Sequence, residues 1–432
     1  MTTSAAALQS LWDSVSTEDA HRHAETLTEY INTNGLRTLL SERILDELLD
    51  KLKDKKQAHL RERAAIGLGA VASKVAGKNA PMPLGAEPWL VNAIPPLLDG
   101  YGDKNEAAKK AAEGAMGALV PLFPPEAAAE LLEMLYSVIT SGTAKWQAKV
   151  GALKIISRLA DLAYEQVGDE LTQITPVLTQ GMHETKAEVS KQAIKTATKV
   201  CGVIDNNDIR PFIPDLVGCM DRPDTVPDCI KKLSSITFVA EVTGPALAVM
   251  VPLLSRALNE RSQTVQRQSV IIVDNLCKLV RDPHTAAMYL PSLLPSVERI
   301  EQGASFPEVR EHAKSAVQTL RAAFAEADKS KDDPHSTDPV AAQAADREHA
   351  LQCLAKAVQP HVPAGIVFSA LGDSYTRTGL EYVARLLVRL ADKRVVQAEP
   401  WNDVYVLPYL RRVCETPEGA QQATDAIRAE FE

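Results

Sequence analysis

Aromatic residues and long apolar runs are both scarce in this sequence. Phe, Trp and Tyr make up 5% of the 432 residues, which disfavours a β-sandwich core built on large rings. No run of about 18 apolar residues occurs, so no transmembrane helix is predicted. The N-terminus lacks the basic and apolar segments of a secretory signal. We therefore expect a mainly helical protein that is neither secreted nor membrane-spanning.

Cysteine is also scarce and scattered. The six cysteines form no Cys-x-x-Cys pair, and no histidine cluster lies near them to complete a zinc site. In a chain of this length, such cysteines are usually small buried hydrophobic residues of a protein in a reducing compartment. The pattern predicts no bound metal and a location in the cytosol or nucleus, of which we expect the cytoplasm.

Motifs of the common enzyme classes are missing. Gly77 and Lys78 resemble the end of a phosphate-binding loop, but Asn79 replaces the required Ser or Thr, and position 72 is Ala instead of Gly. No GxSxG, HExxH or EF-hand spacing occurs. We predict no catalytic residue, no cofactor site and no metal site.

The charge balance limits the partners of the chain. It has 47 basic and 56 acidic residues, which gives a formal net charge of -9. A protein that clamps DNA or RNA with its whole surface would carry the opposite sign. We expect no DNA partner, whereas contact with nucleic acid through local basic patches remains possible.

A repeat with a period of about 40 residues runs through most of the chain. Its marker is an apolar cluster around a proline in the middle of a predicted helix. The anchors are Pro96, Pro176, Pro214, Pro252 and Pro295, at steps of 80, 38, 38 and 43 residues. The first step equals two repeats, and Tyr136 stands at its midpoint in an apolar helix without the proline.

Each marker is followed by a polar turn and a second stretch with amphipathic helical periodicity. These second helices are predicted at residues 57–75, 105–121, 144–160, 186–204, 226–241, 263–280 and 307–324. Seven helical hairpins between about residue 40 and residue 324 are typical of HEAT repeats. One hairpin cannot bury its apolar face alone, so neighbours must stack. The sequence thus predicts an all-α protein with a HEAT-repeat α-solenoid.

Two segments interrupt the repeat. Residues 76–88 carry three prolines and two glycines and are predicted to form a projecting loop. Residues 325–339 are polar and contain two prolines, which is typical of a linker. Four amphipathic helices, at about 340–358, 374–392, 398–413 and 418–431, could then close a four-helix bundle. The predicted domains are residues 1–324 and 340–432.

Basic residues cluster in three places. Six lie between residues 51 and 63 with only two acidic residues. Three lysines recur every four residues from position 191, as an exposed helical stripe would require, and Lys145, Lys149 and Lys154 are expected to form a similar stripe one repeat earlier. The candidates for contact with RNA phosphates are Lys51, Lys53, Lys55, Lys56, Arg61, Arg63, Lys145, Lys149, Lys154, Lys191, Lys195 and Lys199. The alternative is that these side chains only solvate their helices.

Two further places in the sequence, Asp274 with Asn275 and Trp146, are expected to have structural roles. Asp274 and Asn275 stand among apolar residues, so we expect them to bond across adjacent repeats. Trp146 follows Lys145 and could anchor a partner at the surface, although a core position is the expectation for a tryptophan at helical spacing.

Several longer runs resemble one known family. They are DIRPFIP at 208–214, TFVAEVT at 237–243, LNER at 258–261 and DNLCKLV at 274–280. Together with KWQ at 145–147, they are similar to the HEAT region of fungal-type translation elongation factor 3. The C-terminal helices, with LEYV at 380–383 and Trp401, resemble the four-helix bundle that follows this region in the family.

The resemblance implies a cytoplasmic role in translation elongation. Proteins of this family bind ribosomal RNA and ribosomal proteins and assist the release of deacylated tRNA from the exit site, driven by two ATP-binding cassettes. Neither a Walker loop nor an LSGGQ signature occurs in this sequence, so the chain is not expected to be an enzyme. Two alternatives stay open. Another protein could supply the ATP-binding cassettes in trans, or the chain could be a generic HEAT scaffold that binds proteins and not ribosomes.

Overall fold

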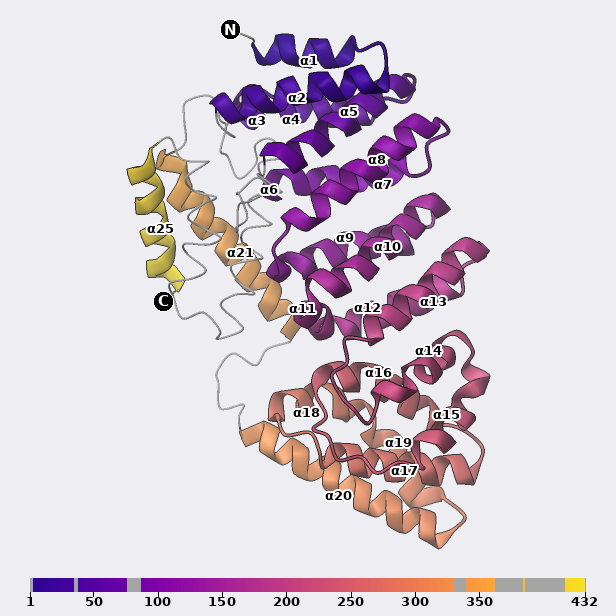
Figure 1. Ribbon diagram of the computed structural model, residues 1–432. Helices are drawn as coiled ribbons and strands as arrows, with labels where there is room; N and C mark the ends of the chain where they lie inside the picture. Colours follow the sequence, from indigo (N-terminus) through magenta and orange to yellow (C-terminus); the bar gives the residue numbers. More distant parts are fainter. Residues whose placement is uncertain are drawn as a thin grey trace. The chain divides into compact units, whose positions relative to one another are not determined.

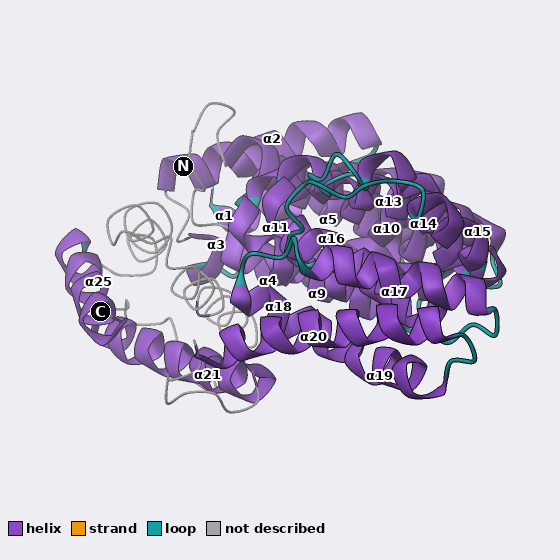
Figure 2. Ribbon diagram, turned by 90° about the horizontal axis from the view of Figure 1, so that it is seen from below, coloured by secondary structure: helices purple, strands orange, loops and turns teal. Residues whose placement is uncertain are grey.

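The computed structural model describes residues 3–34, 38–75, 87–329, 339–361, 384 and 416–431. These residues form helices and the turns between them, with no strand in the described ranges (Figures 1 and 2), which confirms the all-α prediction. The chain divides into two compact units. One comprises Met1–Ala152 and Thr337–Glu432, and the other comprises Leu153–Ser336.

The first unit begins with two N-terminal helices and continues in helical hairpins. Its helices are α1 (Ser4–Trp12), α2 (Thr17–Asn34), α3 (Thr38–Ser41), α4 (Ile44–Leu52), α5 (Ala58–Ala70), α6 (Glu87–Leu90), α7 (Ile94–Gly100), α8 (Glu106–Leu119), α9 (Ala128–Thr140), the start of α10 (Trp146–Leu162), α21 (Pro339–Val358) and α25 (Pro417–Phe431). The second helices α5 and α8 pack side by side. Gly69 permits this close approach, because a Cβ atom there would lie 3.2 Å from the Ala115 Cα.

The second unit continues the same pattern. It contains the remainder of α10, then α11 (Tyr164–Asp169), α12 (Leu171–Met182), α13 (Ala187–Cys201), α14 (Ile213–Asp221), α15 (Val226–Leu233), α16 (Gly244–Ala257), α17 (Gln263–Cys277), α18 (Pro283–Tyr289), α19 (Leu294–Gly303) and α20 (Pro307–Lys329). The seven predicted hairpins are therefore α4–α5, α7–α8, α9–α10, α12–α13, α14–α15, α16–α17 and α19–α20.

The marker prolines do not all lie inside a continuous helix, which corrects the prediction. Pro176 and Pro252 are inside α12 and α16. Pro96, Pro214 and Pro295 instead occupy the first turn of α7, α14 and α19, each preceded by a short 3₁₀ turn. Proline has no N–H to donate and its ring clashes with a carbonyl of the preceding turn, so the start of a helix accommodates it best.

The second helix of the fifth hairpin is shorter than predicted. It ends at Leu233, whereas periodicity predicted helix to residue 241. The segment that follows is held by side chains from the α13–α14 connection. Asp208 Oδ2 accepts the backbone N–H groups of Val239 at 2.7 Å and Ala240 at 2.8 Å, and Asn206 Nδ2 donates to the Glu241 carbonyl at 3.1 Å. These contacts replace the helical hydrogen bonds of the missing turns.

Polar contacts between neighbouring repeats recur at nearly one repeat length. Arg61 reaches Asp103 over 42 residues, Lys145 Nζ reaches the Gly102 carbonyl over 43, and Arg267 reaches Glu308 over 41. A longer contact joins Thr172 Oγ1 to Tyr289 Oη at 2.6 Å over 117 residues in the second unit. Polar contacts thus accompany the hydrophobic packing between these neighbouring repeats.

The predicted ladder at Asp274 is confirmed. Thr319 Oγ1 and Ser315 Oγ of α20 donate to its carboxylate at 2.6 and 3.2 Å, and Nζ of Lys278, the residue that follows α17, donates to it at 2.7 Å. Burial alone would raise the pKa of Asp274, but the hydrogen bonds from Lys278 and Thr319 outweigh it and lower the pKa. Asn275 is exposed, so the prediction was wrong for this neighbour.

Several predicted segments fall largely outside the described residues. Of the projecting loop at 76–88, only the last two residues are described, and they open α6. The helices predicted at 374–392 and 398–413 also lie outside, while those at 340–358 and 418–431 correspond to α21 and α25. Helix α20 extends five residues into the predicted linker, to Lys329. The domain boundary at 325–339 stays a prediction.

Candidate nucleic-acid interface

The lysine stripe of α13 is exposed as predicted. Lys191, Lys195 and Lys199 are exposed, whereas Val189, Ala193, Thr196, Ala197 and Val200 of the same helix are buried. Residues four positions apart lie on the same side of a helix, which places the three ammonium groups on one face. The apolar face is buried within the repeat stack, so the lysine face points to solvent.

The buried face of α13 is tied to the preceding second helix. Thr196 has no exposed surface, and its Oγ1 donates to the Leu153 carbonyl of α10 at 3.0 Å. Gln192 Nε2 donates to the same hydroxyl at 3.2 Å. The bond between Thr196 and Leu153, together with the buried apolar face, holds α13 against α10 with the lysine stripe on the outer side.

A pocket of about 520 Å³ lies where the end of α10 meets α13. It is lined by Ala160, Asp161, Tyr164, Lys195, Thr198, Lys199, Gly202 and Val203. Lys199 forms an exposed ion pair with Asp161, which a phosphate would have to replace. Tyr164 is 44% exposed. An accessible ring beside a lysine is the combination that stacks a base and binds its phosphate. Sequence reasoning missed this tyrosine because it opens the short helix α11, which lies outside the predicted hairpins.

The lysines of the third hairpin do not share a face. Lys145 and Lys154 are exposed, but Lys149 is only 7% exposed. Lys145 precedes α10, and Lys149 and Lys154 lie five residues apart on it, so the three lysines do not follow one side of the helix. The expectation of one exposed stripe is therefore wrong here. Trp146, expected in the core, is the first residue of α10 and is 37% exposed.

The first hairpin presents lysines at its turn. Lys53, Lys55 and Lys56 are exposed between α4 and α5, and Lys51 is partly exposed. Asp54 organises the turn, because its Oδ1 accepts the backbone N–H groups of Gln57 and Lys56, both at 2.7 Å. These two hydrogen bonds lower the pKa of Asp54.

Arg61 is engaged inside the protein. Its Nε and Nη2 donate to the two carboxylate oxygens of Asp103 at 2.6 and 2.9 Å, and its Nη1 donates to the Asp54 carbonyl at 2.8 Å. The hydrogen bonds from Arg61 hold the pKa of Asp103 below its usual value, and Asp103 in turn raises the pKa of Arg61. This bidentate pair joins the first two hairpins.

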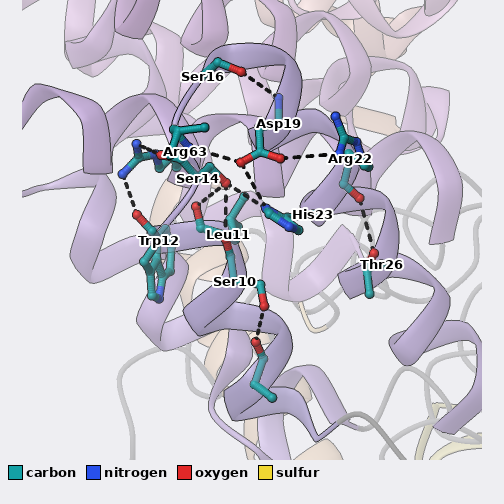
Figure 3. A network of polar contacts seen from close by, with 12 residues as sticks. Ser10, Leu11, Trp12, Ser14, Ser16, Asp19, Arg22, His23, Thr26 and Arg63 are labelled. Atoms are coloured by element: carbon teal, nitrogen blue, oxygen red, sulfur yellow. Dashed lines mark hydrogen bonds and ion pairs between the residues drawn. The ribbon is translucent and has the colours of Figure 1, made fainter.

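Arg63 is also used for packing (Figure 3). Its guanidinium donates to the carbonyls of Trp12 and Ser14, at the end of α1. Ser14 Oγ is within 3.0 Å of His23 Nδ1 on α2. Because helix ends leave carbonyls without partners, Arg63 satisfies groups that would otherwise need water. Arg61 and Arg63 therefore make structural contacts, which leaves them less available for the predicted contact with phosphate.

Two other kinds of feature, a metal site and a membrane-spanning helix, are absent from the described ranges. No described group of three or more His, Cys, Asp or Glu side chains is arranged to hold a metal ion. None of the described helices is long and apolar enough to cross a membrane. The exposed lysines remain the features that could recognise a charged partner.

The stacked hairpins and their inter-repeat contacts define a helical-repeat protein of the HEAT type. Two family models match the chain: "EF3 N-terminal HEAT repeat" over residues 20–197 and "Elongation factor 3/GNC1 HEAT repeat" over residues 225–331. The chain therefore belongs to the elongation factor 3 family of HEAT-repeat regions, which confirms the resemblance seen in the sequence.

Individual relatives agree with this assignment. The chain is 34% identical to elongation factor 3 of Zygosaccharomyces rouxii over 401 residues, 92% of this chain and 36% of that protein. It is 41% identical to the mRNA export factor elf1 of Schizosaccharomyces pombe over 320 residues, 74% of this chain and 30% of that protein. The chain thus spans about a third of these relatives, and the ATPase domains of elongation factor 3 lie outside the match.

A solved structure of importin beta covers 98% of this chain and 62% of its own, at 12% identity and a TM-score of 0.33. This similarity is too low to support an inference about function, and the HEAT assignment comes from the hairpins and the family matches.

Proposed function

We propose that this HEAT-repeat region binds the ribosome and serves translation elongation in the cytoplasm, with exposed lysines neutralising rRNA phosphates and neighbouring surfaces contacting ribosomal proteins. The observation that carries the proposal is the homology to elongation factor 3 over 92% of the chain. The matched part contains no ATPase domain, so the role is binding and not catalysis. Cassettes that act with this region would be supplied by another segment or in trans.

The proposed contact set is narrower than the sequence suggested. Lys191 and Lys195 are its centre, because both are exposed and neither has an ion-pair partner within the described part of the chain. Lys154 and the turn lysines Lys53, Lys55 and Lys56 are secondary candidates. Lys51 and Lys145 are weaker ones, since Lys51 is half-buried and Lys145 donates to the Gly102 carbonyl at 3.0 Å. Such contacts would position the backbone without reading bases.

The test is co-sedimentation with purified ribosomes over a series of salt concentrations. Each phosphate contact releases a counterion, so binding should weaken steeply as salt rises. Reversing two charges, Lys191→Glu with Lys195→Glu, should weaken binding and reduce the slope of log K against log salt by about 2. Circular dichroism should show unchanged helix content, because both side chains are exposed.

The matched control carries the same charge change elsewhere. Lys110→Glu with Lys314→Glu alters two exposed lysines outside the proposed set, so its binding should stay closer to that of the wild type. Equal loss in both double variants would mean that net charge, and not the α13 stripe, governs binding. No sedimentation of the wild type at low salt would refute the proposal itself.

A second candidate function is a role in mRNA export. It is favoured by the 41% identity to the mRNA export factor elf1, which exceeds the identity to elongation factor 3 of Z. rouxii. Ultraviolet crosslinking in cells separates the two candidates, since one predicts crosslinks mainly to rRNA and the other mainly to polyadenylated RNA. A generic protein scaffold would instead retain its partners after ribonuclease treatment and in high salt.

A further inference from the structure

Two cysteines lie in one helical hairpin, away from the lysine stripe. Cys219 is on α14 and Cys229 is on α15, and the 3₁₀ turn Pro223–Thr225 connects the helices. Both cysteines are free thiols, 5% and 3% exposed. Three other free cysteines, Cys201, Cys277 and Cys353, are present among the described residues, each on a different helix.

The register of the hairpin brings the two thiols together. Away from the turn, Lys232 Nζ of α15 donates to Asp215 Oδ1 of α14 at 2.6 Å. Cys219 lies four residues after Asp215 and Cys229 three residues before Lys232, so each is about one helical turn closer to the connection. At the connection, Thr225 Oγ1 lies 3.5 Å from Cys219 Sγ. The two thiols are therefore neighbours across the hairpin, and each acts on the pKa of the other.

The surroundings make the two sulfur atoms unequal. The hydrogen bond from Cys229, supported by Thr225 and by Arg256 of α16, lowers the pKa of Cys219 to about 7, although burial and Asp215 oppose this. The same hydrogen bond and burial raise the pKa of Cys229, against Lys232. In contrast, burial raises the pKa of both Cys201 and Cys277 to about 12. The Cys219 thiol is therefore the more readily ionised, and hence the more reactive, of these cysteines.

We propose that Cys219 and Cys229 are an oxidative modification site, at which a hydroperoxide converts the two facing thiols into a disulfide that joins α14 to α15. The Cys219 thiolate attacks the peroxide oxygen, gives a sulfenic acid, and releases water or an alcohol once a proton is taken up. The Cys229 sulfur then attacks the Cys219 sulfur, forms the S–S bond and expels the hydroxyl group as water. The thiols lose two electrons and the hydroperoxide gains them.

The bond would have a local structural effect. It would fix α15 against α14 immediately before the segment that Asp208 holds. A small thiol could restore both cysteines by exchange, as befits a reducing compartment. This inference is independent of the proposed RNA contact, because none of the candidate lysines lies on these helices.

The experiment uses the reduced full-length chain and hydrogen peroxide under native conditions. Remaining thiols are blocked with N-ethylmaleimide, and the protein is cleaved before aspartate, which separates the two cysteines at Asp221, Asp224 and Asp228. We expect a Cys219–Cys229 linked peptide that disappears on reduction, and a mass loss of about 2 Da in the oxidised intact chain before the thiols are blocked. Oxidation in urea should scatter the links among the six cysteines.

Cysteine variants and an arsenical probe are the controls for this experiment. Cys219→Ser or Cys229→Ser should abolish the link, while Cys277→Ser, a buried cysteine on another hairpin, should leave it. Phenylarsine oxide, which bridges two nearby sulfur atoms, should bind the unmodified native protein once, so the proposal does not depend on a variant that fails to fold. Blocked but unlinked Cys219 and Cys229 after oxidation, together with no arsenical binding, would overturn it.

Discussion

The first hairpin and α13 both carry basic clusters, but they use their charges differently. In the first hairpin, Arg61 and Arg63 bind Asp103 and the end of α1, and only the turn lysines face solvent. On α13, Lys191 and Lys195 stay exposed along one face. The planar guanidinium, with its several fixed donors, suits contacts inside the fold, whereas lysine keeps its ammonium group in water. A dense basic cluster is therefore a poor measure of available charge.

The largest expected effect is a loss of stability when one of the structural arginines of the first hairpin is removed. Arg61→Ala removes a partly buried bidentate contact and leaves Asp103 without its partner, so stability should fall by about 1.5–3 kcal/mol. Urea unfolding followed by circular dichroism measures this loss, with Lys53→Ala as the exposed control from the same hairpin. Equal stability of the two variants would place Arg61 among the solvating residues.

The same pair should make stability depend on pH. The pKa of Asp103 is lowered in the folded state, so its contribution is present above the unfolded pKa of about 3.9 and is lost as pH falls through the folded value. The stability difference between wild type and Asp103→Asn should be constant above pH of about 5 and shrink in more acidic solution. A difference that grows on acidification would contradict this assignment.

A smaller effect tests what holds α13 in place. Thr196→Val keeps the shape of the side chain but removes the buried hydrogen bond to the Leu153 carbonyl, which should cost about 1 kcal/mol. Denaturant unfolding provides the measurement. Thr198→Val, on the exposed face of the same helix, is the matched control, and a larger loss there than at Thr196 would refute the predicted orientation.

The smallest expected effect on stability is at the exposed lysines of α13. Lys195→Ala should change stability by less than about 0.5 kcal/mol, because the side chain is exposed and makes no ion pair in the described ranges. Thermal unfolding checks this, and ribosome co-sedimentation of the same variant should still reveal weaker binding. A large loss of stability would assign Lys195 to the fold and remove it from the proposed contact set.

Periodicity predicted the hairpins because burial of one helix face repeats every three to four residues. It could not locate the end of α15, because the apolar residues continue past Leu233 while the backbone bonds to Asp208 and Asn206, which are distant in sequence. The α13 stripe was predictable from its regular spacing. The burial of Lys149 was not, since a long aliphatic stem can lie within a packed junction.

The inter-repeat contacts also bear on how the chain is assembled during synthesis. Arg61 meets Asp103 and Arg267 meets Glu308 after only about forty further residues have been added, so each junction can be completed soon after its second hairpin emerges, without waiting for distant sequence. The bond between Thr172 and Tyr289 is different, because 117 residues separate its partners. If translation slows or pauses between these two positions, Thr172 stays without its Tyr289 partner for longer than the residues of the other junctions wait for theirs.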